Sequence, residues 1–208
     1  MTPNDIYPQF GPSWRPGQYE AITRLLDYSG RHIVLSLPVG VGKSLVALSY
    51  AKLSGLRSVV LTSTRALQDQ YAKEFGEAVH DIRGLRNYPC SLLLDRGSRD
   101  TTCDLGPCHD SEECVYRNGG CDYYDRIEGA RDAQIVLTNY SMYYTLKEAG
   151  LLHKLGKREL LICDEAHDAA ARLGSYVGVG LNPREVRFPF NADQLDIGFH
   201  YIKVSDAK

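Results

Sequence analysis

The sequence predicts an α/β fold in which helices flank a parallel sheet. Short apolar runs alternate with amphipathic stretches of helical length, and a glycine-rich turn ending in Gly-Lys-Ser follows the first run. The composition is that of a globular protein, because 43% of the 208 residues are hydrophobic and 24% are charged. These values exclude a disordered tail and a collagen-like repeat. The net charge of −2 argues against nucleic-acid binding through overwhelming positive charge, although it allows a local basic groove.

The first half of the chain is expected to contain two strand–helix pairs behind an initial helix. Apolar residues recur at helical spacing from Trp14 to Tyr28, with Pro16 near the start. Residues 31–37 (RHIVLSL) and 58–62 (SVVLT) are short apolar runs, typical of buried strands. Each run is followed by an amphipathic stretch that a glycine closes, so the expected helices cover residues 43–53 and 65–75.

The periodicity stops between about Gly84 and Gly120, in a segment rich in Gly, Pro, Asp and Cys. A loop of this length inside a compact domain is unusual unless something orders it. The regular pattern then resumes, and the expected elements are helices over 123–133 and 141–149 and strands over 134–138 and 159–163.

The segment LPVGVGKS, residues 37–44, has the context of a phosphate-binding loop (P-loop) between a strand and a helix. Lys43 is expected to reach the β- and γ-phosphates of a nucleotide, and the Ser44 hydroxyl to bind Mg²⁺. Leu37 takes the place of the first glycine of the usual pattern, so an ordinary strand–helix turn is the alternative. The candidate nucleotide-binding residues here are Pro38, Val39, Gly40, Val41, Gly42, Lys43 and Ser44.

An apolar strand ends in two adjacent carboxylates at LLICDEAH, residues 160–167. Asp164 is placed to hold the hydrated Mg²⁺ of a P-loop ATPase, and Glu165 to orient and deprotonate the attacking water. His167 is a candidate link between the ATP site and a moving second lobe. The alternative is an exposed helix start, since acidic residues are favoured in a first turn.

Five of the six cysteines fall close together in the aperiodic segment, at positions 90, 103, 108, 114 and 121. In a reducing compartment such a cluster favours metal binding over disulfides. The tight CxxC pairs of a zinc ribbon are absent, and the wider spacing suits a [4Fe–4S] cluster held by four thiolates. A structural zinc ion is the alternative.

Five motifs in this order resemble the iron–sulfur DNA helicases of superfamily 2, the group that contains the DinG and XPD proteins: LPVGVGKS, VVLTSTRALQDQY, the cysteine insert, QIVLTNY and LLICDEAH. The resemblance implies a RecA-like lobe that binds ATP and Mg²⁺, carries an inserted iron–sulfur domain and unwinds DNA in the 5′ to 3′ direction. The corresponding parts are residues 1–83 and 126–180 for the lobe, 84–125 for the insert and 181–208 for a tail that begins a further element.

The resemblance also implies roles for individual residues. Gln18, in an upstream Trp-Arg-Pro-Gly-Gln element, is the candidate for adenine recognition, with a solvent-facing glutamine as the alternative. The implied cluster ligands are Cys90, Cys108, Cys114 and Cys121, with Cys103 spare or exchanged for one of them.

Neutral donors at strand ends are suited to phosphate oxygens, and the resemblance implies that they touch single-stranded DNA. Helix capping and packing are the structural alternatives. The candidates for this contact are Thr62, Thr64, Arg65, Gln68, Asn139 and Tyr140.

ATP-driven unwinding of single-stranded or forked DNA needs a second RecA-like lobe, which supplies an arginine finger. The chain ends 41 residues after His167 (208 − 167), so we expect the second lobe in a missing C-terminal part or in a separate chain. By itself, the chain is then expected to bind ATP but to hydrolyse it poorly and not to unwind DNA.

Two other functional classes fit part of the pattern. One is a metal-stabilised nucleic-acid-binding module that uses ATP only as a switch, and the other is a P-loop kinase or transferase with a zinc insert. The sequence shows no secretion signal and no apolar run long enough for a membrane span, so a cytoplasmic location is expected, or a nuclear one in a eukaryote.

Overall fold

A four-stranded parallel sheet organises the computed structural model, which describes residues 1–99, 101–107, 114–169 and 174. Its strands are β1 (Ser58–Thr62), β2 (His80–Asp81), β3 (Ile135–Asn139) and β4 (Leu160–Cys163). They lie in the order β2-β3-β1-β4, and every neighbouring pair is parallel. The structure therefore confirms the predicted parallel sheet, and the described residues belong to one compact unit, Met1–Tyr176.

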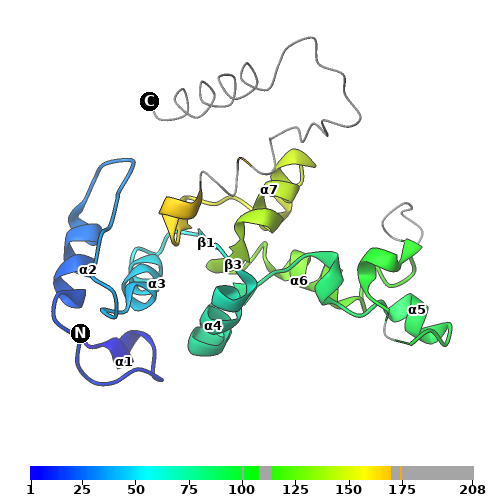
Figure 1. The fold of residues 1–208 in the computed structure, drawn as a ribbon, viewed down its shortest axis with the longest axis horizontal. Coiled ribbons are helices and arrows are strands. Elements are labelled where there is room, and N and C mark those ends of the chain that lie inside the picture. Colours follow the sequence, from blue (N-terminus) through cyan, green and yellow to red (C-terminus); the bar gives the residue numbers. More distant parts are fainter. Residues whose placement is uncertain (100, 108–113, 170–173, 175–208) are drawn as a thin grey trace, which may run out of the picture. The chain divides into compact units, whose positions relative to one another are not determined.

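Helices precede and connect the strands (Figure 1). They are α1 (Pro3–Ile6), α2 (Gln18–Asp27), α3 (Lys43–Leu53), α4 (Arg65–Phe75), α5 (Ser91–Asp95), α6 (Asp122–Gly129) and α7 (Tyr140–Glu148). Short 3-10 turns occupy Gly76–Ala78, Leu85–Asn87, Cys103–Leu105 and Leu152–Leu155. A membrane-spanning helix is absent from the part of the chain that the structure describes.

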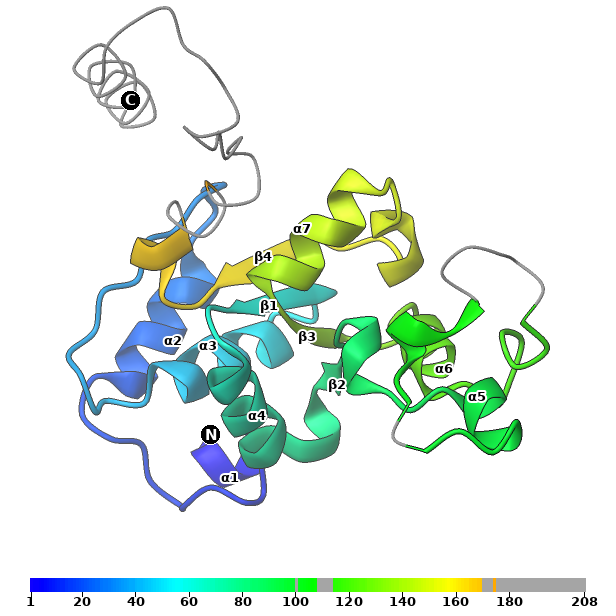
Figure 2. The same ribbon diagram turned by 45° about the vertical axis from the view of Figure 1, so that its right-hand side comes forward.

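Helices cover both faces of the sheet. Successive side chains of a strand point to opposite faces, so two neighbouring residues of β1 show what covers each face. On one face, Val60 of β1 packs in a buried cluster with Leu48 of α3 and Phe75 of α4. On the other face, its neighbour Val59 packs in a second cluster with Met142 of α7 and with α6. Figure 2 shows α4 and α7 on opposite sides of the strands.

The local sequence patterns predicted α3, β1 and α4 with the bounds that the structure has. The strand expected over residues 31–37 is wrong, because these residues form no regular element and the Val34 side chain is 96% exposed. A strand needs a partner, and an apolar run by itself does not specify one. β4 is consequently the last described strand on its side of the sheet.

Two helices begin directly where strands end. Thr64, two residues beyond the end of β1, caps α4 by accepting a hydrogen bond from Leu67 N at 3.2 Å. Asn139 ends β3 and caps α7 by accepting from Met142 N at 2.9 Å. These caps satisfy backbone donors that a helix start leaves free. They place the beginnings of α4 and α7 at the carboxyl edge of the sheet, where β4 also ends.

Candidate functional site

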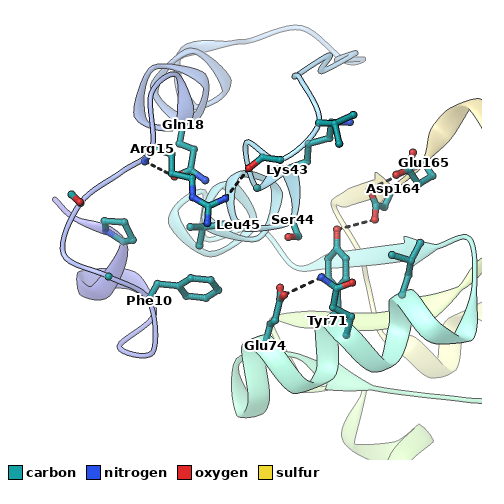
Figure 3. Close-up of a pocket in the computed structure, with 18 residues that line it drawn as sticks. Phe10, Arg15, Gln18, Lys43, Ser44, Leu45, Tyr71, Glu74, Asp164 and Glu165 are labelled. Atoms are coloured by element: carbon teal, nitrogen blue, oxygen red, sulfur yellow. Dashed lines mark hydrogen bonds between the residues drawn. The ribbon is translucent and has the colours of Figure 1, made fainter.

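The two motifs that the sequence singled out line one cavity at this edge of the sheet. The cavity has a volume of about 690 Å³, which lies in the range of small-molecule sites. Its wall includes the P-loop residues Gly40, Gly42, Lys43 and Ser44 together with Asp164 and Glu165 (Figure 3). Residues far apart in sequence thus meet where α3 begins and β4 ends. This is the arrangement expected of a nucleotide site in an open parallel sheet.

Glycines shape the loop before α3. Gly40 and Gly42 have φ angles of 83° and 86°, a left-handed conformation that side chains rarely adopt. A Cβ atom on Gly42 would also lie 2.8 Å from Gln18 Nε2. Gly42 is the N-cap of α3, so the free backbone donors of this 11-residue helix begin at the cavity wall. Val39 lines the cavity as well, whereas Pro38 and Val41 are not among its lining residues.

Gln18 is hydrogen-bonded to the P-loop backbone. Its side chain is 2% exposed, its Oε1 accepts from Arg15 N at 2.9 Å, and its Nε2 donates to Val41 O at 2.6 Å. Arg15 Nη1 in turn donates to Gly40 O at 2.7 Å (Figure 3). Gln18 borders the cavity, but its amide makes these contacts within the chain. Adenine recognition by Gln18 therefore stays a prediction. It would use the second N–H donor and the second lone pair of the amide.

The acidic pair is held by hydrogen bonds and by an unusual backbone. The pKa of Asp164 is raised above its ordinary value, chiefly by burial. A hydrogen bond from Tyr71 and the charge of Lys43 offset part of this shift. The backbone N–H of Glu165 donates to Asp164 Oδ1 at 3.0 Å, and Glu165 itself has a φ of 50°. A non-glycine residue in this region is strained, which is common at functional sites. A partly desolvated carboxylate gains from a nearby cation, so Asp164 suits a magnesium ligand.

His167 lies outside the cavity wall and is exposed, at 74% of its side chain. Its Nδ1 atom lies 3.3 Å from Glu165 Oε2, and its Nε2 atom lies 3.6 Å from Asp168 Oδ1. The histidine therefore contacts the candidate catalytic acid from the solvent side. Its suggested link to a second lobe stays a prediction.

The six candidates for nucleic-acid contact divide into exposed and buried side chains. Thr64 and Arg65 are exposed at the start of α4. Thr62 and Gln68 are fully buried and Tyr140 is 2% exposed, so these three offer almost no surface to a nucleic acid. Asn139 is half-buried as the cap of α7.

Gln68 joins the starts of the two strand-end helices, a role that the sequence did not reveal. Its Nε2 donates to Asp81 Oδ1 at 2.6 Å and to Ile82 O at 2.9 Å. Its Oε1 accepts from Asn139 Nδ2 at 2.9 Å. The partners come from two other parts of the chain, Asp81 with Ile82 and Asn139, so no local pattern could have identified them. Gln68 and Asn139 thus lock α4 to the start of α7.

Buried thiols form a small core of their own in the aperiodic segment. Cys90, Cys103 and Cys121 pack together with surrounding tyrosines and leucines, and the Sγ atoms of Cys103 and Cys121 are 3.9 Å apart. Cys114 is buried outside this group, and no disulfide joins any two of the cysteines that the structure describes. Cys103, which the sequence left spare, is thus central, whereas Cys108 lies outside the described residues. Among the described residues, no three His, Cys, Asp or Glu side chains are arranged to hold a metal ion.

The sixth cysteine, Cys163, differs from its prediction. The sequence places it in an apolar strand and suggests a core residue, but its side chain is exposed. It lies on β4, at the edge of the described sheet, where fewer neighbours cover the side chains.

Comparison with known proteins identifies a family for most of the chain. Residues 12–192 match the family described as Type III restriction enzyme, res subunit. This range contains both the P-loop and the acidic box. A search of curated proteins finds no match.

Proposed function

Because the chain belongs to the Type III restriction enzyme, res subunit, family and has the N-terminal lobe of a superfamily 2 helicase, we propose that it is the ATP-binding part of a DNA helicase. One observation carries this proposal: Lys43, Ser44, Asp164 and Glu165 line a single cavity. The finer features, which are 5′ to 3′ unwinding and a second RecA-like lobe that completes the site, rest on the resemblance of the five motifs.

The chain supplies separate groups for binding and for hydrolysis. The start of α3 and the Lys43 ammonium suit the phosphates, and the Ser44 hydroxyl and the Asp164 carboxylate suit the magnesium ion. When bound, magnesium neutralises charge that develops on the phosphate oxygens. Glu165, next to the metal ligand, orients the attacking water and accepts its proton. His167 contacts Glu165 and can influence that proton transfer.

Magnesium-dependent ATP binding is the direct test. We expect a fluorescent ATP analogue to bind the unmodified chain about tenfold more tightly with Mg²⁺ than with EDTA, since a hydrogen-bonded contact to a charged group is worth about 1.5–3 kcal/mol. Equilibrium titration in the two buffers measures this ratio. Equal affinity in both, or no binding, contradicts the proposal. Transfer of the γ-phosphate to a small molecule would instead favour a kinase.

We further propose that single-stranded DNA contacts the start of α4. Thr64 and Arg65 are exposed there, beside the helix N-terminus, and donors of this kind contact phosphates. The net charge of −2 requires such contacts to be local. The site lies at the same edge of the sheet as the nucleotide cavity, which is the arrangement that a motor needs in order to couple the two ligands.

Arg65→Ala is expected to weaken binding of single-stranded DNA severalfold and to reduce its salt dependence. Removing one phosphate contact lowers the slope of log K against log salt by about 0.7 for a single strand. Fluorescence anisotropy at several salt concentrations measures both effects. The matched control is Arg24→Ala, because Arg24 is exposed on α2, forms an ion pair with Glu20 of the same helix and does not line the nucleotide cavity. An unchanged slope for Arg65→Ala would remove this contact.

The cysteine segment, we infer, holds a metal centre, with a [4Fe–4S] cluster as the first candidate from the resemblance. The thiols fit this role in chemical type and in burial, but the described part does not form a complete ligand set. One observation favours zinc as the second candidate. Two thiolates on one tetrahedral zinc ion, each at about 2.3 Å, lie about 3.8 Å apart, and Cys103 and Cys121 are separated by 3.9 Å.

A further inference from the structure

Two buried tyrosine hydroxyls converge on Asp164. Tyr71 Oη donates to Asp164 Oδ2 at 2.9 Å, and Tyr140 Oη donates to the backbone oxygen of Asp164 at 3.0 Å. Both side chains are almost fully buried, at 3% and 2% exposure. Figure 3 shows the Tyr71 hydroxyl directed at the carboxylate across the cavity from α3. The Tyr71 hydroxyl is the donor in this bond, because an ionised carboxylate can only accept.

These contacts fix both oxygens of the carboxylate. Oδ2 accepts from Tyr71, and Oδ1 accepts from the backbone N–H of Glu165 at 3.0 Å. Each carboxylate oxygen has a second lone pair, so either can still bind a cation. The orientation of the carboxylate is therefore set before a metal ion arrives. Supporting hydrogen bonds of this kind preorganise a ligand for its metal ion.

The two tyrosines belong to the two helices that begin at the strand ends. Tyr71 lies on α4, whose start carries the exposed Thr64 and Arg65. Tyr140 is the first residue of α7, directly after its cap Asn139. Each of the two helices is thus connected to Asp164 by the hydroxyl of one side chain.

A second connection keeps the two helices in register with each other. Gln68 lies one helical turn before Tyr71 and accepts the hydrogen bond from Asn139, the residue before Tyr140. Residues three apart share one face of a helix, so Gln68 and Tyr71 face the sheet together. Two sets of hydrogen bonds therefore connect α4 with α7: the bond between Gln68 and Asn139, and the bonds from Tyr71 and Tyr140 to Asp164.

We propose that Tyr71 and Tyr140 are positioning residues that orient Asp164 and link magnesium–nucleotide binding to contacts at the starts of α4 and α7. This inference rests on the proposed function, because it assigns Asp164 to magnesium and the α4 start to nucleic acid. Coupling between two ligands is reciprocal, so DNA that shifts α4 changes the affinity for Mg·ATP, and Mg·ATP changes the affinity for DNA by the same factor.

The test compares Tyr71→Phe and Tyr140→Phe with Tyr144→Phe, a control on α7 whose hydroxyl bonds Glu148 in the same helix. For Tyr71→Phe we expect unchanged ATP affinity in EDTA and a loss of up to about tenfold in the gain that Mg²⁺ provides, since its hydroxyl bonds a charged group. For Tyr140→Phe, which loses a bond to a neutral carbonyl, we expect about a threefold loss. In both variants, the change in Mg·ATP affinity caused by single-stranded DNA should shrink toward none.

A purely structural role would lower thermal stability without changing the ratio of affinities in Mg²⁺ and EDTA. Full retention of both the Mg²⁺ gain and the DNA effect in the two folded variants therefore overturns the inference while the proposed function stands. Should Tyr71→Phe not fold, Tyr140→Phe decides the question alone. Absence of Mg²⁺-dependent binding in the unmodified chain overturns the proposed function and this inference with it.

Discussion

Replacing Lys43 with alanine is expected to weaken ATP binding by about 10- to 100-fold, because a hydrogen bond to a charged group contributes about 1.5–3 kcal/mol. Lys43 lines the cavity at the first residue of α3. Arg15, another cation of the cavity wall, already donates to Gly40 O. The loop backbone remains after the substitution, so the loss falls on the β- and γ-phosphates. ADP should lose less affinity than ATP.

Equilibrium titration of a fluorescent nucleotide, with thermal unfolding as the check on folding, measures this effect. The matched control is Lys73→Ala, because Lys73 is exposed on α4 and does not line the cavity. It should bind ATP as the unmodified chain does. Equal affinities for Lys43→Ala and Lys73→Ala would show that the glycine-rich turn does not bind phosphate and only connects α3 to the preceding segment.

The sequence predicted the cavity because its parts are local motifs attached to a simple sheet. The glycine turn and the start of α3 depend on neighbouring residues, as does the pair of carboxylates after β4. β4 ends at the carboxyl edge of the parallel sheet, and the start of α3 lies at the same cavity although no strand precedes its glycine turn, so Ser44 and Asp164 meet there. The residue types at those ends then indicate the chemistry.

Contacts between distant residues were beyond the same reasoning. Tyr71 and Asp164 are 93 positions apart, and Gln68 and Asn139 are 71 apart. Gln68 and Tyr140 have polar side chains of the kind that bind ligands, and the sequence therefore suggested that they contact DNA. Tertiary packing buries both of them instead. The short strand β2 could not be predicted from the sequence either, since two residues are too few to show a periodic pattern.

Replacing Cys121 with serine is expected to unfold residues 84–125 and to leave the sheet and its nucleotide cavity intact. The small core of this segment consists of thiols with a few tyrosines and leucines, which is little apolar surface for its length. Metal binding by thiolates contributes roughly 10 kcal/mol to the folding of small structural zinc sites. Losing one ligand removes most of such a contribution. Hydrogen exchange should then show full loss of protection in the segment and unchanged protection in β1 and β3.

Cys163→Ser is the matched control, since Cys163 is exposed on β4 and outside the segment, so protection there should not change. Chelation should reproduce the effect of Cys121→Ser, and the released metal identifies the centre: an iron–sulfur cluster absorbs visible light, and zinc does not. Cys103→Ser separates the ligand sets, because the structure places the Cys103 thiol 3.9 Å from that of Cys121. Unfolding by Cys103→Ser as complete as by Cys121→Ser makes Cys103 a ligand. Retained protection after both substitutions and after chelation means that packing of the tyrosines holds this segment without a metal.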